Sequence, residues 1–459
     1  MPRHVLAAVC LLSVPLVHAQ EIVSERAEEG PALTVYQQDL ALVRERRTVE
    51  LPKGRVELVV NGISRQIVPE SSSVVAQGLE VSSINYLPVT LTPEALLERY
   101  IGKAVTVVHR APLNGAPARE QGTLLSAGNG RPLVRIGDRV EIGGPDAPWQ
   151  LAFDSVPADL RGKDSLVVEL DSASRGRRTL DLTYLTRGLS WQADYLLELD
   201  ERGREARLSA WATLDNRTGM PVQNAKVRLV AGAPNQVRQP QPMYAARAMK
   251  AEAADMAQEA LHDYRVYTLS EPVDLLGQQR KQVRLLAPRQ VPLVREYETE
   301  GHALHLTADP QDTPVQVLLK LRNEAPRLGQ PLPAGTVRVY GDGPGKQLQF
   351  LGEDHMPQSV PGQELELKLG SATELSSKRT PASSNRIDQN TTEVEWVIEL
   401  RNAKSEPVTV TVVEHLPGDW RILEESDKHR KAAAQEAHWR LEVPAQGKRE
   451  LRYRAQLRL

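Results

Sequence analysis

The chain has 459 residues, which is enough for about three domains. Hydrophobic residues make up 41% and charged residues 25%, a balance typical of folded globular proteins and not of disordered or membrane-embedded chains. Lys and Arg number 57 against 59 Asp and Glu, so the net charge of -2 gives no sign of a surface that binds nucleic acid or anionic lipid.

The first 19 residues have the pattern of a secretory signal peptide. Arg3 gives a weakly basic start, residues 5–17 are mostly apolar, and Ala19 precedes Gln20 at the expected cleavage site. The apolar run is too short to span a bilayer. We therefore expect a periplasmic or secreted bacterial protein. Cleavage near Ala19-Gln20 would remove Cys10, the single cysteine, so folding would proceed without disulfides.

Alternation of apolar and polar residues dominates the chain from residue 33 onward. It is clearest in residues 191–199, 394–400 and 451–459, and it predicts antiparallel strands with one buried face. Residues 93–101 predict one short helix. The Gly-punctuated strands between residues 105 and 142 predict a small barrel of the SH3-like type.

The predicted fold is mainly β, with tandem antiparallel β-sandwich (immunoglobulin-like) domains and a small SH3-like barrel insertion. The expected divisions are a signal peptide (1–19), an N-terminal β domain (20–92), the barrel-like insertion (93–150), a β-sandwich region (151–370) and a C-terminal β-sandwich (371–459). Within the fourth, residues 239–263 form an insertion whose Ala and Glu content favours a helix, whereas the preceding Gln-Pro repeat favours an exposed loop.

Three predicted strands end in the same way, at Asn216, Asn323 and Asn402, and each is followed by a polar turn and another strand. Asn suits such a position because it tolerates left-handed backbone angles and hydrogen-bonds its own turn. The repetition indicates one strand-turn-strand device used three times, unless it is coincidence.

Six ordered segments carry a family resemblance: residues 182–195, 214–219, 225–232, 332–340, 351–353 and 400–404. In this order they closely resemble the bacterial domain of unknown function 4139 over residues 165–459. Some members, the mucoidy-inhibitor A-like proteins, carry a long coiled coil before this region, and this chain lacks its heptads. The resemblance implies a fold and a cell-envelope setting but no reaction. The motif residues, which we expect to be structural, are Tyr184, Gly188, Trp191, Tyr195, Asn216, Gly219, Pro333, Gly335, Arg338, Gly352 and Asn402.

No motif in the sequence predicts a cofactor or a catalytic residue. His302 and His305 are three apart, which in a strand places them on opposite faces, so we expect no shared zinc site. Met249 and Met256 are weak candidates for a Cu(I) site because thioethers are soft ligands. We favour the alternative that they form an adaptable apolar stripe. Trp191, Tyr195 and Tyr184 are candidates for a sugar-stacking face, but the alternating apolar face that Trp191 and Tyr195 share favours the core.

These observations favour an exported, non-enzymatic binding or assembly module of the cell envelope. Its expected partner is a protein or an envelope component. The alternative is an envelope hydrolase that acts on glycan or peptide through an inter-domain carboxylate pair. A convergent pocket with two carboxylates of raised pKa would favour the hydrolase, and a shallow apolar-rimmed surface would favour the module.

Overall fold

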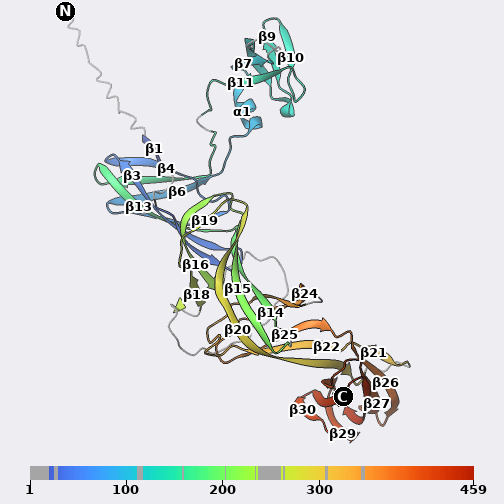
Figure 1. Cartoon of the computed structure of the whole chain (residues 1–459). Helices are drawn as coiled ribbons and strands as arrows, with labels where there is room; N and C mark the ends of the chain where they lie inside the picture. Colours follow the sequence, from blue (N-terminus) through green and yellow to red (C-terminus); the bar gives the residue numbers. More distant parts are fainter. Residues whose placement is uncertain are drawn as a thin grey trace, which may run out of the picture. The chain divides into compact units, whose positions relative to one another are not determined.

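The structure, a computed structural model, describes residues 20–24, 29–110, 117–157, 160–201, 203–232, 234–235, 260–261, 264–304, 309–342 and 347–459. The predicted signal peptide, Met249, Met256, His305 and most of the insertion at 239–263 lie outside these residues. Strands dominate the part described and α1 (Pro93–Tyr100) is its one α-helix, so the prediction of a mainly β protein is confirmed (Figure 1). Two compact units divide the chain: the residues up to Ser190 with Asp215–Arg280, and Trp191–Leu214 with Lys281–Leu459.

The first unit contains two larger sheets. One has the order β1-β4-β12-β6, and the other has the order β17-β18-β16-β2-β3-β13-β5, with β19 also paired to β16. Strand β3 buries every second residue and pairs along its whole length with β13, as the alternation predicted. The bounds are β1 (Gln20–Ser24), β2 (Ala32–Tyr36), β3 (Ala41–Leu51), β4 (Gly54–Asn61), β5 (Ile67–Val75), β6 (Leu79–Leu87), β12 (Ser165–Ser172), β13 (Gly176–Thr186), β16 (Val222–Ala231), β17 (Ala260–Leu261), β18 (Tyr264–Thr268) and β19 (Val273–Leu275).

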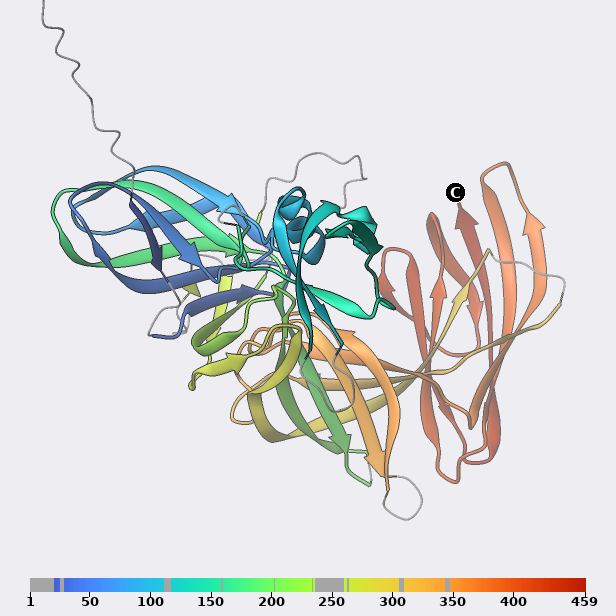
Figure 2. The same cartoon turned by 90° about the horizontal axis from the view of Figure 1, so that it is seen from above.

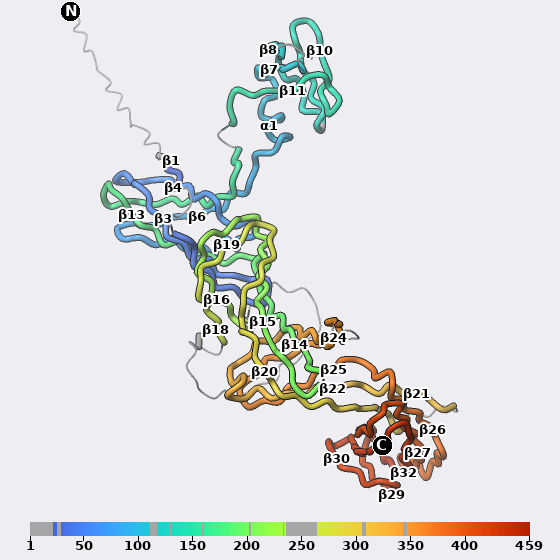
Figure 3. Tube along the Cα trace, in the orientation of Figure 1, coloured from blue at the N-terminus to red at the C-terminus, as the bar shows by residue number. Residues whose placement is uncertain are grey.

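A small domain is inserted between β6 and β12. It comprises α1, β7 (Ala104–His109), β8 (Arg119–Ser126), a 3-10 turn (Gly128–Gly130), β9 (Leu133–Ile136), β10 (Arg139–Ile142) and β11 (Trp149–Ala152). The sheet order is β10-β9-β8-β7-β11 and every pairing is antiparallel. The two segments by which the chain enters and leaves the domain lie side by side (Figure 3). A backbone hydrogen bond from Leu91 N to Arg161 O joins them.

The sheet of this small domain is open, which corrects the expectation of a barrel. Its outer strands β10 and β11 do not pair. Just after β10 the chain packs closely on two rings: a Cβ built at Gly143 would lie 2.8 Å from both the Trp149 ring and the Pro132 ring. The hydrophobic core beneath the sheet is continuous and consists of Tyr100, Val105, Val107, Leu124, Val134, Ile136 and Trp149.

The second unit contains two sheets. The larger has the order β24-β23-β14-β15-β20-β28-β31-β30 with β22 and β25 attached, and the smaller has the order β21-β26-β27-β32-β29. The bounds are β14 (Leu189–Leu199), β15 (Glu205–Asn216), β20 (Gln279–His302), β21 (Gln311–Thr313), β22 (Gln316–Arg322), β23 (Gly335–Asp342), β24 (Leu348–Met356), β25 (Glu364–Ser371), β26 (Leu375–Arg386), β27 (Thr391–Asn402), β28 (Val408–His415), β29 (Asp419–Glu425), β30 (Arg430–Ala433), β31 (Glu436–Val443) and β32 (Gly447–Arg458).

The C-terminal strands of this unit, orange to red in Figure 2, form a β-sandwich. Strands β27 and β32 pair over twelve residues in one sheet, and β28 pairs with β31 in the other. Their inward faces share one core in which Trp396, Trp439 and Tyr453 are completely buried. This is the arrangement that alternating strands of this length predict.

Candidate binding pocket

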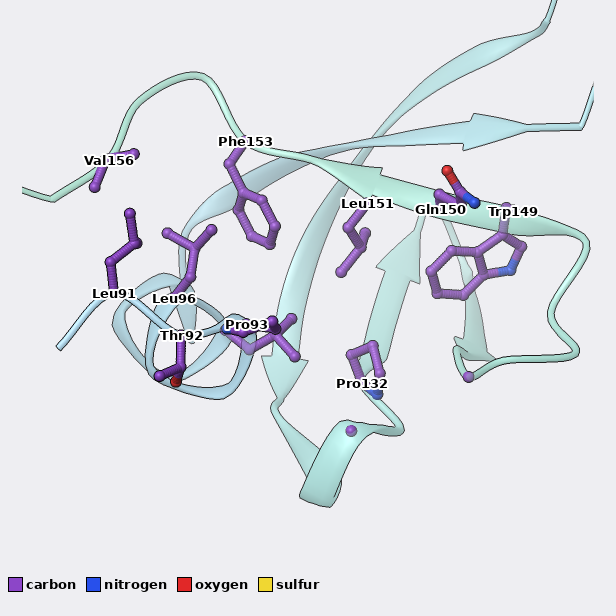
Figure 4. Close-up of a pocket in the computed structure, with 13 residues that line it drawn as sticks. Leu91, Thr92, Pro93, Leu96, Pro132, Trp149, Gln150, Leu151, Phe153 and Val156 are labelled. Carbon is purple, nitrogen blue, oxygen red and sulfur yellow. The ribbon is translucent and has the colours of Figure 1, made fainter. Parts of the chain in front are cut away.

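An apolar pocket of about 510 Å³ lies within the small domain. Its lining contains no charged side chain. Figure 4 shows Trp149, Leu151 and Phe153 pointing from β11 and its continuation toward the side chains of α1 and toward Pro132. The lining residues are Leu91, Thr92, Pro93, Leu96, Leu97, Gly130, Pro132, Gly144, Trp149, Gln150, Leu151, Phe153 and Val156.

Local sequence explains how these side chains converge. Residues 149, 151 and 153 alternate, so an extended chain presents them on one side. Thr92 caps helix α1, because its hydroxyl accepts a hydrogen bond from Ala95 N at 3.1 Å, and Pro93 suits the first turn. The spacing of Pro93, Leu96 and Leu97 then places all three on the face that lines the pocket.

The back of the pocket is fixed by aromatic packing. The Tyr100 and Phe153 rings meet edge to face with centroids 4.8 Å apart. The Tyr100 hydroxyl donates to Ser155 O at 2.6 Å, which holds the chain after β11 against the helix. Trp149 is only 4% exposed. The pocket is therefore bounded by buried core residues, whereas Leu96, Leu151 and Phe153 in its lining are partly exposed.

The lining can bind apolar groups but has no acid, base or nucleophile for a reaction. Its polar side chains are those of Thr92, whose hydroxyl caps α1, and Gln150. A concave, mainly apolar site of this volume is the usual form of a ligand pocket. Of the residues in it, Pro93, Leu96 and Leu97 lie in the short helix that the sequence predicted. A usable signal was present, because the chain has just two Phe and one of them, Phe153, lines the pocket.

The aromatic residues of the family motif are buried in the core. Tyr184, Trp191 and Tyr195 are exposed by 0%, 2% and 1%, so they form no surface on which a sugar could stack. The Tyr195 hydroxyl donates to Pro333 O at 2.7 Å and so joins two motif segments far apart in sequence.

Two further motif residues, Gly335 and Arg338, lie on β23 and pack this strand against β14. Gly335 is required by close packing, because a Cβ there would overlap Ala193 O. Arg338 Nη1 donates to Asp194 Oδ1 at 2.9 Å, and Thr213 donates to the second oxygen of the same carboxylate at 2.5 Å. Three motif glycines have positive φ: Gly188 (77°), Gly219 (76°) and Gly352 (156°).

Asn216 and Asn402 use one hydrogen-bonding scheme in the two units. Each side-chain oxygen accepts from the backbone N–H two residues later, of Thr218 and Lys404 respectively. Each amide nitrogen donates to the carbonyl four residues later and also to two successive carbonyls at the end of another strand: Leu275 and Leu276 for Asn216, Val443 and Pro444 for Asn402.

Asn323 differs in detail from these two. Its amide donates to Gln330 O at 2.8 Å and to the Ser359 hydroxyl at 3.2 Å. The strand ends that repeat in the sequence therefore share a hydrogen-bonding pattern of the Asn side chain. The pattern is nearly the same at Asn216 and Asn402 and differs in its partners at Asn323.

Histidine residues meet in a way that the sequence spacing did not predict. His302 lies opposite His415 in the parallel pair β20 and β28, and the two rings stack with centroids 4.7 Å apart. Across the described ranges, no group of three or more His, Cys, Asp or Glu residues is arranged to hold a metal ion.

The carboxyl group of Glu298 on β20 has a raised pKa. Burial, and then the nearby carboxylates of Glu300 and Glu366, raise its pKa above the usual 4.5. The folded chain therefore keeps this proton to higher pH than the unfolded chain. The stability that the proton contributes is present below pH 4.5 and is lost as the pH rises through the folded-state value.

The substitution Glu298→Gln is expected to make the protein more stable than the wild type at neutral pH, with the difference closing as the pH falls below 4.5. Urea unfolding at both pH values measures it. Glu364→Gln, at an exposed carboxylate paired with Arg322, is the control and should not show this pH-dependent gain. A Glu298→Gln protein less stable than the wild type at neutral pH would contradict the assignment.

The fold and the pocket together define a β-sandwich protein with an apolar pocket on a small inserted domain. The chain belongs to the family Domain of unknown function (DUF4139), whose profile matches residues 180–459. This confirms the resemblance. The pocket lies outside the matched residues, at positions 91–156. No curated protein matches the chain. No helix in the described ranges has both the length and the apolar character needed to cross a membrane.

Proposed function

We propose that this protein is an exported, non-enzymatic binding or assembly module of the bacterial cell envelope, and that the pocket on the small domain is its recognition site. One observation carries the proposal: a preformed pocket of about 510 Å³ whose lining has no charged side chain. Such a lining favours the burial of an apolar group of a partner, at about 25 cal/mol for each Å² removed from water.

The carboxylates of the second unit support this choice over an envelope hydrolase. Among the described carboxyl groups, raised pKa values are resolved for Glu298 and Glu414. Glu414 is fully buried and is bonded to Arg379 and Tyr453, so no substrate reaches it. Glu298 has Lys320 and Lys368 among its neighbours, on the polar face of a strand. Turnover of purified peptidoglycan by the pure protein would overturn the proposal.

The binding site is tested in cells by a photo-crosslinking residue placed at the pocket. Val156 lines the pocket and is 52% exposed. Val140 on β10 is also 52% exposed and does not line it, which makes it a matched control in the same domain. We expect a partner to be crosslinked from position 156 and not from position 140. Equal crosslinking from both positions would contradict a partner site at the pocket.

Export has its own test. The proposal expects the protein to be recovered from the periplasm or medium with Gln20 as its first residue, as determined by intact mass or N-terminal sequencing. A cytoplasmic protein that still carries residues 1–19 would refute the localisation without affecting the assignment of the pocket.

A further inference from the structure

Strand β11 has an open edge. In the part of the chain that the structure describes, it pairs on one side with β7 and is the last strand of its sheet. Arg110 N donates to Pro148 O at 2.9 Å on the β7 side, and Trp149 lies opposite His109. Because hydrogen-bonded pairs alternate along an antiparallel ladder, the backbone N–H and C=O groups of Trp149 and Leu151 face the open edge.

The two outer strands of this sheet differ in charge. On β10, exposed Arg139 pairs with Glu141 at 2.7 Å and with Glu120 at 2.6 Å. Charged side chains of this kind discourage another strand from adding to an edge. The β11 sequence, Trp-Gln-Leu-Ala, has no charge and no proline. Only this second edge is suited to pair with another chain.

The same residues form the open edge and part of the pocket lining. Trp149 and Leu151, whose peptide groups face outward, also send their side chains into the pocket beside Phe153 (Figure 4). In a sheet, residues directly opposite each other on neighbouring strands project from the same face, about 4.5–5.5 Å apart. Every second side chain of an added strand would therefore lie on the pocket side.

We propose that the pocket receives an extended peptide segment of a partner protein, which adds as a strand to β11 and places apolar side chains at alternate positions in the pocket. This rests on the proposed function and gives its ligand class. Backbone hydrogen bonds to Trp149 and Leu151 supply affinity, and the uncharged lining selects apolar residues. An acyl chain would fill the same lining but would leave the backbone groups of the β11 edge without partners.

The test uses the full-length protein and a set of capped, fluorescent heptapeptides in which Leu, Val or Phe alternates with Thr. Binding is measured by fluorescence anisotropy. Each binding peptide is also made in two N-methylated forms, one for each alternating set of amides. One form blocks the hydrogen bonds toward β11, and the other blocks only amides that face solvent.

We expect at least one alternating peptide to bind. One of its N-methylated forms should bind at least about tenfold more weakly, since two hydrogen bonds are lost, while the other form stays within about threefold. Equal affinities of the two forms, or no binding by any peptide, would overturn the inference. We expect sodium dodecanoate to displace a bound peptide. If dodecanoate binds and no peptide does, the inference of a peptide ligand is overturned and the ligand class is an acyl chain.

Two variants locate the site on β11. Leu151→Asp brings a charge into the apolar lining and is expected to weaken binding at least about tenfold. Ala152→Asp changes an exposed position on the opposite face and should stay within about twofold. Thermal unfolding of both variants checks that they fold. Equal weakening by both would contradict the pocket as the site. Failure of the peptides while position 156 still crosslinks a partner in cells would reject this inference alone.

Discussion

Replacing Arg379 by leucine is expected to lower the free energy of unfolding of the C-terminal sandwich by about 3–5 kcal/mol. Arg379 is 2% exposed and donates to both oxygens of Glu414, at 2.8 and 2.6 Å. Burial raises the pKa of Glu414, while Arg379 acts to lower it. Without Arg379, the buried carboxylate is left with the Tyr453 hydroxyl, which donates to Glu414 Oε2 at 2.8 Å.

The surroundings make this substitution hard to accommodate. The Arg379 guanidinium also lies 4.1 Å from the centroid of the Trp396 ring, and Gly301 leaves room for the pair, since a Cβ there would be 2.5 Å from Glu414 Oε1. Arg401→Leu is the matched control because its partner Glu399 is at the surface, and it should cost less than about 1 kcal/mol. Denaturant unfolding followed by tryptophan fluorescence compares them. A similar small loss in both variants would show that the buried pair contributes little.

Asn402→Ala is expected to cost about 2–3 kcal/mol, although it removes no charge and little volume. It leaves the Lys404 N–H and the carbonyls of Glu406, Val443 and Pro444 without their present partner in a site where Asn402 is 2% exposed. Leaving buried backbone groups unsatisfied costs about 1–3 kcal/mol for each that finds no water.

Asn385→Ala is the control for this substitution. Asn385 is exposed on β26, and a surface change of this kind is expected to stay within about 0.5 kcal/mol. The same denaturant experiment serves both variants. If Asn402→Ala were as stable as Asn385→Ala, the repeated Asn would be incidental to the fold and not one of its structural devices.

The positions of the strands were predictable because a strand with one buried face has an apolar residue at every second position. The alternation at residues 394–400 and 451–459 became the paired strands β27 and β32, and helix α1 begins at Pro93 as expected. The open form of the sheet in the small domain was not predictable in this way. It depends on how the Trp149 and Pro132 rings fill the space beside Gly143, which no local period encodes.

The site was less predictable than the fold. Family-motif residues such as Tyr195 and Asn216 stand out in the sequence, and the structure places them in the core. The pocket residues come from separate turns and strand ends around residues 91–97, 130–132 and 144–156, and each is ordinary by itself. A pairing such as His302 with His415, more than a hundred residues apart, likewise depends on strand order and not on spacing.

We propose that the pocket on the small domain recognises a partner, and this proposal can be tested in the cell. The most direct measurement is in-cell photo-crosslinking from position 156, with and without Leu151→Asp in the same chain. We expect one partner to be crosslinked from position 156 and not from position 140, and this crosslink should disappear when position 151 carries the aspartate. A crosslink from position 156 that persists unchanged with Leu151→Asp would contradict the proposal.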